Sequence, residues 1–461
     1  MVFNSIPFLV FIVLFFLVWA RLKKNNSLKW LWIILASFLF YAWWDWRFLF
    51  ILIATGVVDF FAGKKIQTSE KKSFLWLWIS LSSNILSLIF FKYSPWICKF
   101  LDSQLNSNLY DSLPEFSLVV PVGISFYTFN SMSYTIDIYR KKVEPARNIL
   151  HFFSFIAFFP HLVAGPIIRA KDILGQLTHN RPLNSLVILN GIKTCIWGFF
   201  QKMVLADNLA IYVNEHYSSV HSYSDSFAWW ICIMAFSFQI YFDFNGYSTI
   251  ARGIAKLCGI HFKLNFNQPY LAHSFKNFWQ RWHISLSSFF KDYVYKSLGG
   301  NRQSKIKTEI NRWITMLISG LWHGANFTFI VWGALHAAFL TIESQIFKRL
   351  KIKFPHILIV PIIFLLTNLS WVFFRANDIN DATYVFLKLF EFNLNINILK
   401  TMQSNVFLWL IISLLIVFLP KQWFQKSIFK TIGFQSLLWA FLCVACVFLR
   451  GPEQQFIYFQ F

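Results

Sequence analysis

Charged side chains are scarce in this sequence. Only 13% of its 461 residues are Asp, Glu, Lys or Arg, whereas 57% are hydrophobic and 20% are aromatic. A soluble protein of this length does not bury so many apolar side chains, so the composition excludes a soluble enzyme and predicts a polytopic membrane protein. Acidic residues are rarer still, with 20 Asp and Glu against 42 Lys and Arg. In a membrane protein such a basic excess usually lies in cytoplasmic loops against anionic lipid, so it does not indicate nucleic-acid binding.

Several common signals are also missing. The six cysteines form no disulfide framework, and Cys443 and Cys446 have C-x-x-C spacing inside an apolar stretch, which favours packing over redox chemistry. The first apolar run has no basic residue before it and no small-residue cleavage site after it, which argues against a cleaved signal peptide. No internal repeat or low-complexity linker divides the chain. We therefore expect residues 1–461 to form a single integral membrane domain.

Long apolar runs alternate with polar loops, and the charges of these loops predict their side of the membrane. The segments 64–72, 140–147 and 421–430 are rich in Lys and Arg, whereas the loops between the opposite ends of the runs carry acidic residues. The positive-inside rule then places the basic segments in the cytoplasm and both termini outside. At about 20 residues per helix, we predict about ten spans. They cover residues 6–20, 31–44, 48–62, 74–91, 118–139, 187–205, 227–251, 354–374, 406–420 and 432–449.

Two further apolar runs have basic residues at both ends. The first covers residues 150–168 and is interrupted by Pro160 and by Gly165-Pro166, and the second covers 313–346. Each should therefore begin and end on the cytoplasmic side. Because non-helical backbone at membrane depth is tolerated only inside protein or along a water-filled cavity, we expect two re-entrant hairpins.

A histidine lies inside the second hairpin, in the stretch Gly320-Leu321-Trp322-His323-Gly324-Ala325-Asn326. An ionisable group at lipid depth is energetically unfavourable and indicates a functional site by default. The structural alternative is that Gly320 and Gly324, spaced as G-x-x-x-G, form a helix-packing notch while His323 hydrogen-bonds a neighbouring helix. Both interpretations stay open at this point.

A second histidine, His283, lies in a segment too rich in Lys and Arg to span the membrane. Apolar side chains between 275 and 293 recur at helical spacing, which predicts an amphipathic helix at the membrane interface. His283 falls at the edge of the apolar face and so looks into protein or membrane. A histidine that is merely solvated or hydrogen-bonded is the alternative. The apolar face comprises Phe275, Trp279, Trp282, Leu286, Phe290 and Tyr293, and the opposite side carries Lys276, Gln280, Ser287 and Lys291.

Four sequence blocks occur in a specific order: VPVGISFYTF at 120–129, FPHLVAGPI at 159–167, YFDFNGYS at 241–248 and FWQRWHISLS at 278–287. They are followed by LGGNR at 298–302, GLWHGA at 320–325 and the ending FIYFQF. Together they resemble the membrane-bound O-acyltransferase (MBOAT) family of the bacterial alginate and peptidoglycan O-acetyltransferase type, which includes teichoic-acid D-alanyl transferases. The resembling core covers about residues 118–340. The sequence departs from the family pattern at His161 and Asn245, and these departures do not affect the two candidate histidines, His283 and His323.

The resemblance implies an all-α polytopic fold, a ring of about ten transmembrane helices plus re-entrant hairpins around a central tunnel. It implies that His323 is the catalytic histidine and His283 a supporting one. The donor would be a cytosolic acyl thioester, acetyl-CoA or an acyl carrier protein, with no cofactor bound permanently and no metal. The acceptor would be an extracytoplasmic polysaccharide or a periplasmic SGNH-like partner acyltransferase, reached from the bacterial cytoplasmic (inner) membrane. Further expected positions are Asp243, Trp282, Trp322, Asn326 and Ser285 along the tunnel or substrate, and Tyr458 and Phe461 in partner recognition.

Acyl transfer from a thioester to a hydroxyl needs a base for the hydroxyl proton and polar groups for the developing oxyanion. Histidine suits the base role because its pKa lies near neutrality. No zinc-like Cys/His/Asp spacing accompanies the two histidines, and no G-x-S-x-G motif occurs in a strand–turn–helix context, which disfavours a metal site and a serine hydrolase.

Asp243 is either a polar wall of the tunnel or a buried carboxylate capped by Asn245 or Ser248. The open alternatives for the whole chain are D-alanyl transfer, a proton-coupled transporter and a structural scaffold for envelope assembly.

Overall fold

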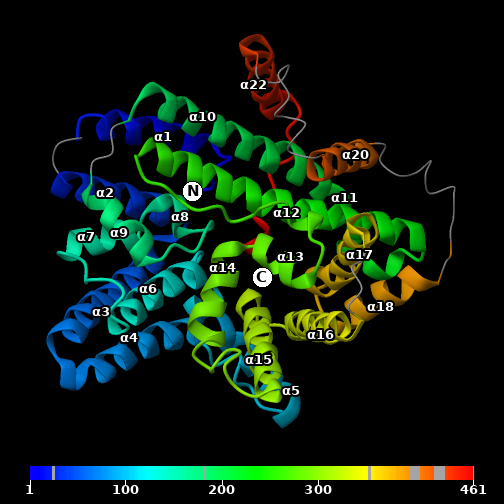
Figure 1. Ribbon diagram of the computed structural model, residues 1–461, viewed down its shortest axis with the longest axis horizontal. Helices are drawn as coiled ribbons and strands as arrows, with labels where there is room; N and C mark the ends of the chain where they lie inside the picture. The colour runs from blue at the N-terminus through cyan, green and yellow to red at the C-terminus, as the bar shows by residue number, and fades with distance from the viewer. Residues whose placement is uncertain are drawn as a thin grey trace. The chain divides into compact units, whose positions relative to one another are not determined.

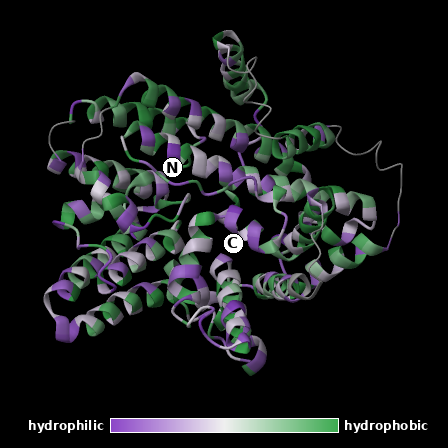
Figure 2. Cartoon of the chain, viewed as in Figure 1, coloured by the Kyte–Doolittle hydropathy of each residue, from purple (hydrophilic) through white to green (hydrophobic). Residues whose placement is uncertain are grey.

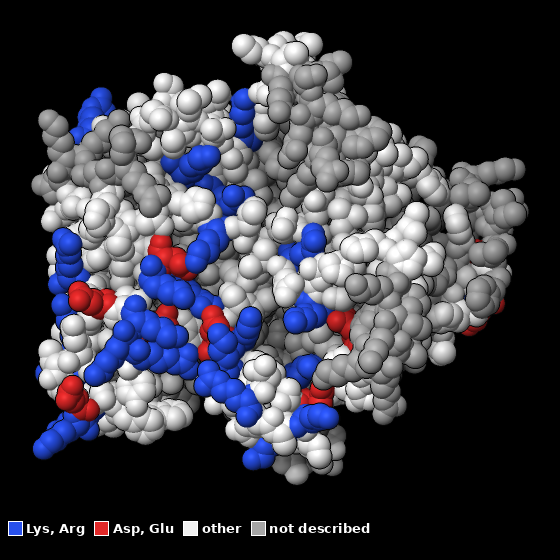
Figure 3. Space-filling model, viewed as in Figure 1, with Lys and Arg blue, Asp and Glu red and all other residues white. Residues whose placement is uncertain are grey.

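A computed structural model describes residues 1–22, 26–179, 183–350, 355–391, 393, 405–419 and 431–459. Every regular element in these residues is a helix (Figure 1). Hydrophobic residues run along most of the helices (Figure 2), and basic side chains outnumber acidic ones on the face seen in Figure 3. The prediction of an all-α polytopic membrane protein is confirmed. Within the described residues, five helical segments are long and apolar enough to cross a membrane, at 26–68, 70–105, 226–257, 327–345 and 356–375, and shorter apolar helices occur at 6–19, 405–418 and 432–448.

The first of two compact units comprises Met1–Cys195 and Ser248–Lys263. Its helix α3 packs against α4, α6 and α7, and α2 packs against α7 and α8. The buried carboxylate of Asp59 in α3 accepts hydrogen bonds from Ser80 Oγ (2.5 Å) and Asn84 Nδ2 (2.9 Å) in α4, which joins these helices by polar contacts. The unit contains α1 (Ile6–Trp19), α2 (Asn26–Asp45), α3 (Leu49–Thr68), α4 (Ser73–Leu88), α5 (Ser94–Leu105), α6 (Ile124–Tyr139), α7 (Ile149–Ile156), α8 (Phe159–Leu162), α9 (Ala170–Thr178), most of α10 (Ser185–Phe199) and the end of α12 (Ser226–Leu257).

The first predicted hairpin contains only two short helices, α7 and α8, followed by non-helical backbone up to Ala170. All residues from 151 to 170 are buried. Protein groups satisfy the irregular backbone, since Asn130 Oδ1 accepts from Ile168 N–H (2.9 Å) and Ser37 Oγ accepts from Phe159 N–H (3.0 Å). This run therefore does not span as a helix, as predicted, and the side from which it enters the membrane stays a prediction.

The predicted span 118–139 is wrong at its beginning, because helix α6 starts only at Ile124. Gly123 adopts a left-handed conformation (φ 77°), and a Cβ at this position would lie 2.5 Å from the carbonyl oxygen of Leu162. The chain thus turns at a glycine that no other residue could replace without strain. The preceding Pro121 removes a backbone donor and also disfavours an earlier helix start.

The second unit comprises Ile196–Tyr247 and Leu264–Phe461. Its helices α15 and α16 pack against each other as a hairpin around His323, with the turn at 324–326. Because α16 is long and apolar enough to cross a membrane, the re-entrant path predicted for 313–346 stays a prediction. A Cβ on Gly320 would lie 2.2 Å from the carbonyl oxygen of Phe329, so Gly320 is indeed a helix-packing notch. The unit's main elements are η5 (Phe200–Ala206, a π-helix), α11 (Asp207–Ser218), most of α12, α13 (Phe275–Arg281), α14 (Ile284–Phe289), η8 (Phe290–Tyr295), α15 (Lys305–His323), α16 (Phe327–Leu350), α17 (His356–Arg375), α18 (Ile379–Phe390), α20 (Asn405–Phe418), α22 (Ile432–Phe448) and η10 (Ile457–Phe459).

The continuous amphipathic helix predicted over 275–293 is wrong, because the helix breaks at Trp282 and His283 between α13 and α14. The preceding segment replaces the helical hydrogen bonds: Asn265 O accepts from Ile284 N–H (2.8 Å), and Arg281 O accepts from Asn267 N–H (2.9 Å). The predicted apolar face is nevertheless right. Its members are buried except Trp279, which is partly exposed, and Lys276, Gln280 and Lys291 are exposed.

Candidate functional site around two buried histidines

His323 is the last residue of α15 and is buried, with 3% of its surface exposed. Gly324 follows in an extended conformation and ends the helix. Aromatic rings surround the imidazole on several sides and hold it in place. Their centroids lie 4.9 Å (Trp322), 5.0 Å (Phe374), 5.1 Å (Trp332) and 5.4 Å (Tyr458) from that of His323.

His283 is fully buried in the left-handed backbone conformation between α13 and α14 (φ 41°, ψ 55°). Its Nδ1 lies 3.2 Å from Asn265 Oδ1, which also accepts from Ser285 Oγ (2.8 Å). Because an amide oxygen only accepts, Nδ1 of His283 carries the proton in this contact. The Nε2 atom is buried and has no hydrogen-bond partner in the described part of the chain. A neutral His283 therefore presents an acceptor at Nε2.

The two histidines belong to one site. The ring of Trp322 lies 6.0 Å from His283 and 4.9 Å from His323, and the ring of Tyr458 lies 6.3 Å and 5.4 Å from them, centroid to centroid. Residues 40 positions apart in the sequence are thus brought against the same two aromatic side chains. The structure joins the candidates that the sequence singled out separately.

Tyr458 reaches this site because the C-terminal segment is fastened to α12 and η5. Asp243 of α12 accepts a hydrogen bond from Ile457 N–H (2.7 Å) and pairs with Lys202 Nζ (2.8 Å), which also pairs with Asp207 (2.7 Å). Phe456 and Ile457 are buried, and Tyr458 is partly exposed. Asp243 is thus bound by a lysine and a backbone amide, not by the caps considered from the sequence. Phe461 lies outside the described residues, and partner recognition by Tyr458 stays a prediction.

The other predicted site residues lie at different distances from the histidines. Trp322 contacts both rings, and Ser285 shares Asn265 with His283. Trp282 is buried one layer away, against Trp371 (5.0 Å) and Phe278 (5.6 Å). Asn326 lies in the turn after His323, where its Oδ1 accepts from Thr328 N–H (3.1 Å) at the start of α16. Whether any of them touches substrate stays a prediction.

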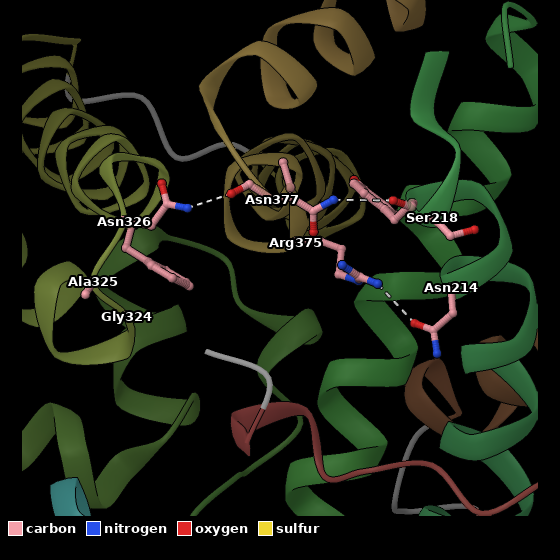
Figure 4. Close-up of a pocket in the computed structure, with 10 residues that line it drawn as sticks. Asn214, Ser218, Gly324, Ala325, Asn326, Arg375 and Asn377 are labelled. Atoms are coloured by element: carbon pink, nitrogen blue, oxygen red, sulfur yellow. Dashed lines mark hydrogen bonds between the residues drawn. The ribbon is translucent and has the colours of Figure 1, made fainter. Parts of the chain in front are cut away.

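A pocket of about 580 Å³ lies at the turn that follows His323, and His323 itself is not one of its lining residues (Figure 4). It is formed by the end of α11, the turn of the hairpin and the end of α17. Asn326 Nδ2 donates to Asn377 O (2.6 Å) across the pocket, and Arg375 Nη2 donates to Asn214 Oδ1 (3.1 Å). Its lining residues are Asn214, Tyr217, Ser218, Gly324, Ala325, Asn326, Phe329, Arg375, Ala376 and Asn377.

The sequence reasoning missed four polar residues around this site. Lys202 lies within a predicted apolar span and Arg375 at the predicted outer end of another, where the positive-inside rule disfavours a basic residue. The unusual positions of Lys202 and Arg375 could therefore have been noticed in the sequence. Asn265 and Asn214 lie in polar loop or helix-end sequence and carried no signal, since only the fold brings them to the site.

The fold and the site define a polytopic membrane protein with a buried, histidine-containing polar centre. Residues 73–377 match the model of MBOAT, the membrane-bound O-acyltransferase family, and the chain belongs to this family. It is therefore an O-acyltransferase, and the transporter and scaffold alternatives are set aside.

Named relatives agree with this assignment. The chain is 37% identical over 400 residues to the probable alginate O-acetylase AlgI of Pseudomonas aeruginosa, covering 85% of this chain and 75% of the relative. It is 36% identical over 393 residues to the peptidoglycan O-acetyltransferase of Helicobacter pylori, covering 78% and 74%. The teichoic acid D-alanyltransferase of Bacillus subtilis matches over 242 residues at 28% identity, covering 50% and 60%.

Proposed function

We propose that this enzyme transfers an acetyl group from a cytosolic acyl thioester to a hydroxyl of an extracytoplasmic polysaccharide, directly or through a periplasmic SGNH-like acyltransferase. The alginate O-acetylase and the peptidoglycan O-acetyltransferase match 85% and 78% of this chain and the teichoic acid D-alanyltransferase 50%, which supports acetyl over D-alanyl transfer. The enzyme would work in the bacterial cytoplasmic membrane, with acetyl-CoA or an acyl carrier protein as donor. The observation that carries the proposal is that His283 and His323 are both buried against Trp322 and Tyr458.

His323 acts as the general base in this proposal. It removes the proton of the acceptor hydroxyl as the oxygen attacks the thioester carbonyl carbon, and a tetrahedral oxyanion forms. The carbon–sulfur bond then breaks, the ester remains on the acceptor oxygen, and the proton passes from His323 to the leaving thiolate. The aromatic rings around His323 exclude water, which limits hydrolysis of the thioester.

His283 positions the acceptor hydroxyl. Its Nδ1 proton faces Asn265 Oδ1, so its Nε2 is the atom that can accept a hydrogen bond from an entering hydroxyl. The same tautomer cannot donate from Nε2 to a thioester carbonyl, which argues against a role for His283 in binding the carbonyl. The hydrogen bond from Nδ1 to Asn265 fixes both the tautomer and the ring orientation of His283.

The product identifies the acyl group. The full chain is expressed in a host lacking its own copy, and acids released from purified envelope polysaccharides by mild base are identified by mass spectrometry. Acetate released only when the chain is present supports the proposal. D-Alanine in place of acetate establishes the D-alanyl alternative, and no released acid from any polymer contradicts the proposed reaction.

A further inference from the structure

The pocket at the turn after His323 has one basic residue in its lining, Arg375. The guanidinium of Arg375 lies 4.8 Å from the centroid of the Tyr217 ring, and its Nη2 donates to Asn214 Oδ1 (3.1 Å). Both partners are neutral, so these contacts give the guanidinium no counter-ion. Its Nε is buried and has no hydrogen-bond partner within the described residues. Arginine presents five N–H donors in a planar fork that matches a carboxylate or a phosphate.

The rest of the lining favours a carbohydrate. None of the ten lining residues is acidic, and the nearby carboxylate of Asp381 instead accepts from Asn377 Nδ2 (3.2 Å) and lies 3.4 Å from His221 Nε2. Amide and hydroxyl groups can exchange hydrogen bonds with sugar hydroxyls, and aromatic rings offer apolar faces for a sugar ring. The side chains that supply these groups are Asn214, Asn326, Asn377, Ser218, Tyr217 and Phe329 (Figure 4).

The charge pattern of the sequence places this pocket on the outer side. The end of α11 belongs to a predicted outer loop, the turn at 324–326 is the point of the re-entrant hairpin farthest from its basic ends, and α17 is predicted to cross outward to Arg375. Each of these assignments follows from the basic residues that precede or flank that segment. The structure brings all three to one pocket, which supports an opening toward the extracytoplasmic acceptor.

We propose that this pocket is the acceptor subsite and that Arg375 binds an anionic group, a carboxylate or a phosphate, on a sugar next to the one that is acylated. The inference rests on the proposed function and adds the chemical class of the acceptor. Gly324 follows His323 directly, and Phe329 and Phe374 pack against the His323 ring (6.4 and 5.0 Å). A sugar held in the pocket therefore has its neighbour close to the general base.

Binding is tested without acyl donor on the full chain carrying His323→Ala, so that no acyl group is transferred during the measurement. The probes are a glucuronic acid tetrasaccharide, the same tetrasaccharide with its carboxylates reduced to alcohols, and the reduced form carrying one phosphate. Because a hydrogen bond to a charged group contributes about 1.5–3 kcal/mol, an anionic probe should bind roughly 10-fold to 100-fold more tightly than the neutral one. A preference for only one of the two anionic probes identifies the anion. Equal affinity for all three probes, or no binding of any, overturns the proposal.

Variants at the guanidinium assign the preference to Arg375. Arg375→Gln should abolish the preference for anionic probes, and Arg375→Lys should retain part of it, because lysine keeps the charge but loses the fork. Arg47→Gln removes an exposed arginine in the first unit and should change nothing. A preference that survives in a folded Arg375→Gln protein overturns the proposal.

A negative charge introduced beside Arg375 provides a second variant, which we expect to fold because its hydrogen bonds can be kept. Asn214→Asp keeps the acceptor for Arg375 Nη2, and the amide of Gln454, which now accepts from Asn214 Nδ2 (3.1 Å), can turn to donate instead. The added negative charge should lower the affinity for anionic probes by about tenfold and leave the neutral probe unchanged. Unchanged affinity for the anionic probes contradicts the proposal even if Arg375→Gln does not fold.

Steady-state kinetics separate this inference from the proposed function. With His323 intact, Arg375→Gln should raise KM for the anionic acceptor and change kcat less than about threefold, as expected for a group that binds ground and transition states equally. If the chain prefers anionic probes but transfers no acyl group to them, the proposed function fails. If it transfers equally well to charged and neutral acceptors, only the present inference fails.

Discussion

At the scale of the residue, His283 shows most clearly how backbone conformation serves the site. A non-glycine residue at φ 41° is uncommon, and asparagine tolerates this region best among the residues with a side chain. The left-handed turn aims the imidazole at Phe244 and Trp322 and leaves its Nδ1 against Asn265. Strained backbone of this kind is found at functional sites when the surrounding structure holds it in place.

His283→Asn removes the imidazole without adding backbone strain. We expect it to lower acyl transfer by roughly 10-fold to 100-fold, less than loss of the base, because positioning is partly shared with other contacts. His283→Ala should show the same loss of rate and also a lower Tm, since alanine tolerates the left-handed region less well. Initial rates and Tm of the two purified variants check this. A wild-type rate in His283→Asn would rule out a positioning role.

At the scale of the element, the hairpin of α15 and α16 depends on how closely its two helices approach. The sequence predicted the hairpin from its basic flanks and its glycines. Gly320 is a packing notch, as the structural interpretation held, and a functional role of His323 stays a prediction. The break at His283 could not be predicted in this way. Its cause is hydrogen bonding from a segment about 18 residues earlier, which helical periodicity does not reveal.

Gly320→Ala should destabilise the enzyme. Its Cβ would meet the backbone oxygen of Phe329, which cannot move as a flexible side chain can, so we expect a loss of about 1–3 kcal/mol or more. Gly433→Ala in α22 is the matched control, because a Cβ there meets nothing within 4 Å. Thermal unfolding of the two proteins in detergent gives the comparison. Equal Tm values would contradict the close helix contact.

The C-terminal segment is the second element on which the site depends. Asp243→Asn removes a buried charge that pairs with Lys202 and accepts from Ile457 N–H, and breaking such a pair typically destabilises by about 3–5 kcal/mol. We expect acyl transfer to fall in Asp243→Asn and in a chain truncated after Gln455, with membrane insertion retained in both.

If Asp243 acts by holding the C-terminal segment, the two changes are not additive, and Asp243→Asn has little further effect in the truncated chain. The four rates of this double-mutant cycle, each divided by the amount of protein in the membrane fraction, provide the test. Strictly additive losses would show that Asp243 acts independently of the segment that carries Tyr458.

At the scale of the whole molecule, the sequence predicted the fold class and the family, and the comparisons confirm both. The long apolar runs sufficed for the fold class, because a membrane-spanning segment of about 20 residues satisfies its backbone hydrogen bonds as a helix. The family was predicted from the resemblance of the ordered sequence blocks. The prediction of one domain, the ring around a tunnel and the sidedness stay predictions. Asn265, the hydrogen-bond partner of His283, could not be predicted, because only the tertiary structure brings it to the site. The basic segment 421–430 lies outside the described residues.

The topology has a direct test in single cysteines introduced into a chain whose six native cysteines are replaced by alanine. Cysteine at position 71 or 142, both exposed and in predicted cytoplasmic loops, should resist a membrane-impermeant thiol reagent in intact cells. Cysteine at position 380, exposed in the predicted outer segment after Arg375, should be labelled. Labelling at 71 and protection at 380 would invert the orientation and move the pocket to the cytoplasmic face.

The most direct test of the account is the rate of acyl transfer by purified His323→Ala protein reconstituted in lipid vesicles, with acyl thioester as donor and the polymer identified from cells as acceptor. General-base catalysis contributes roughly 10²–10⁴-fold, so the account predicts a fall of that size. Donor binding and protein abundance should match those of the wild type, because only the base is lost. Transfer by His323→Ala at the wild-type rate would contradict the mechanism proposed for this site.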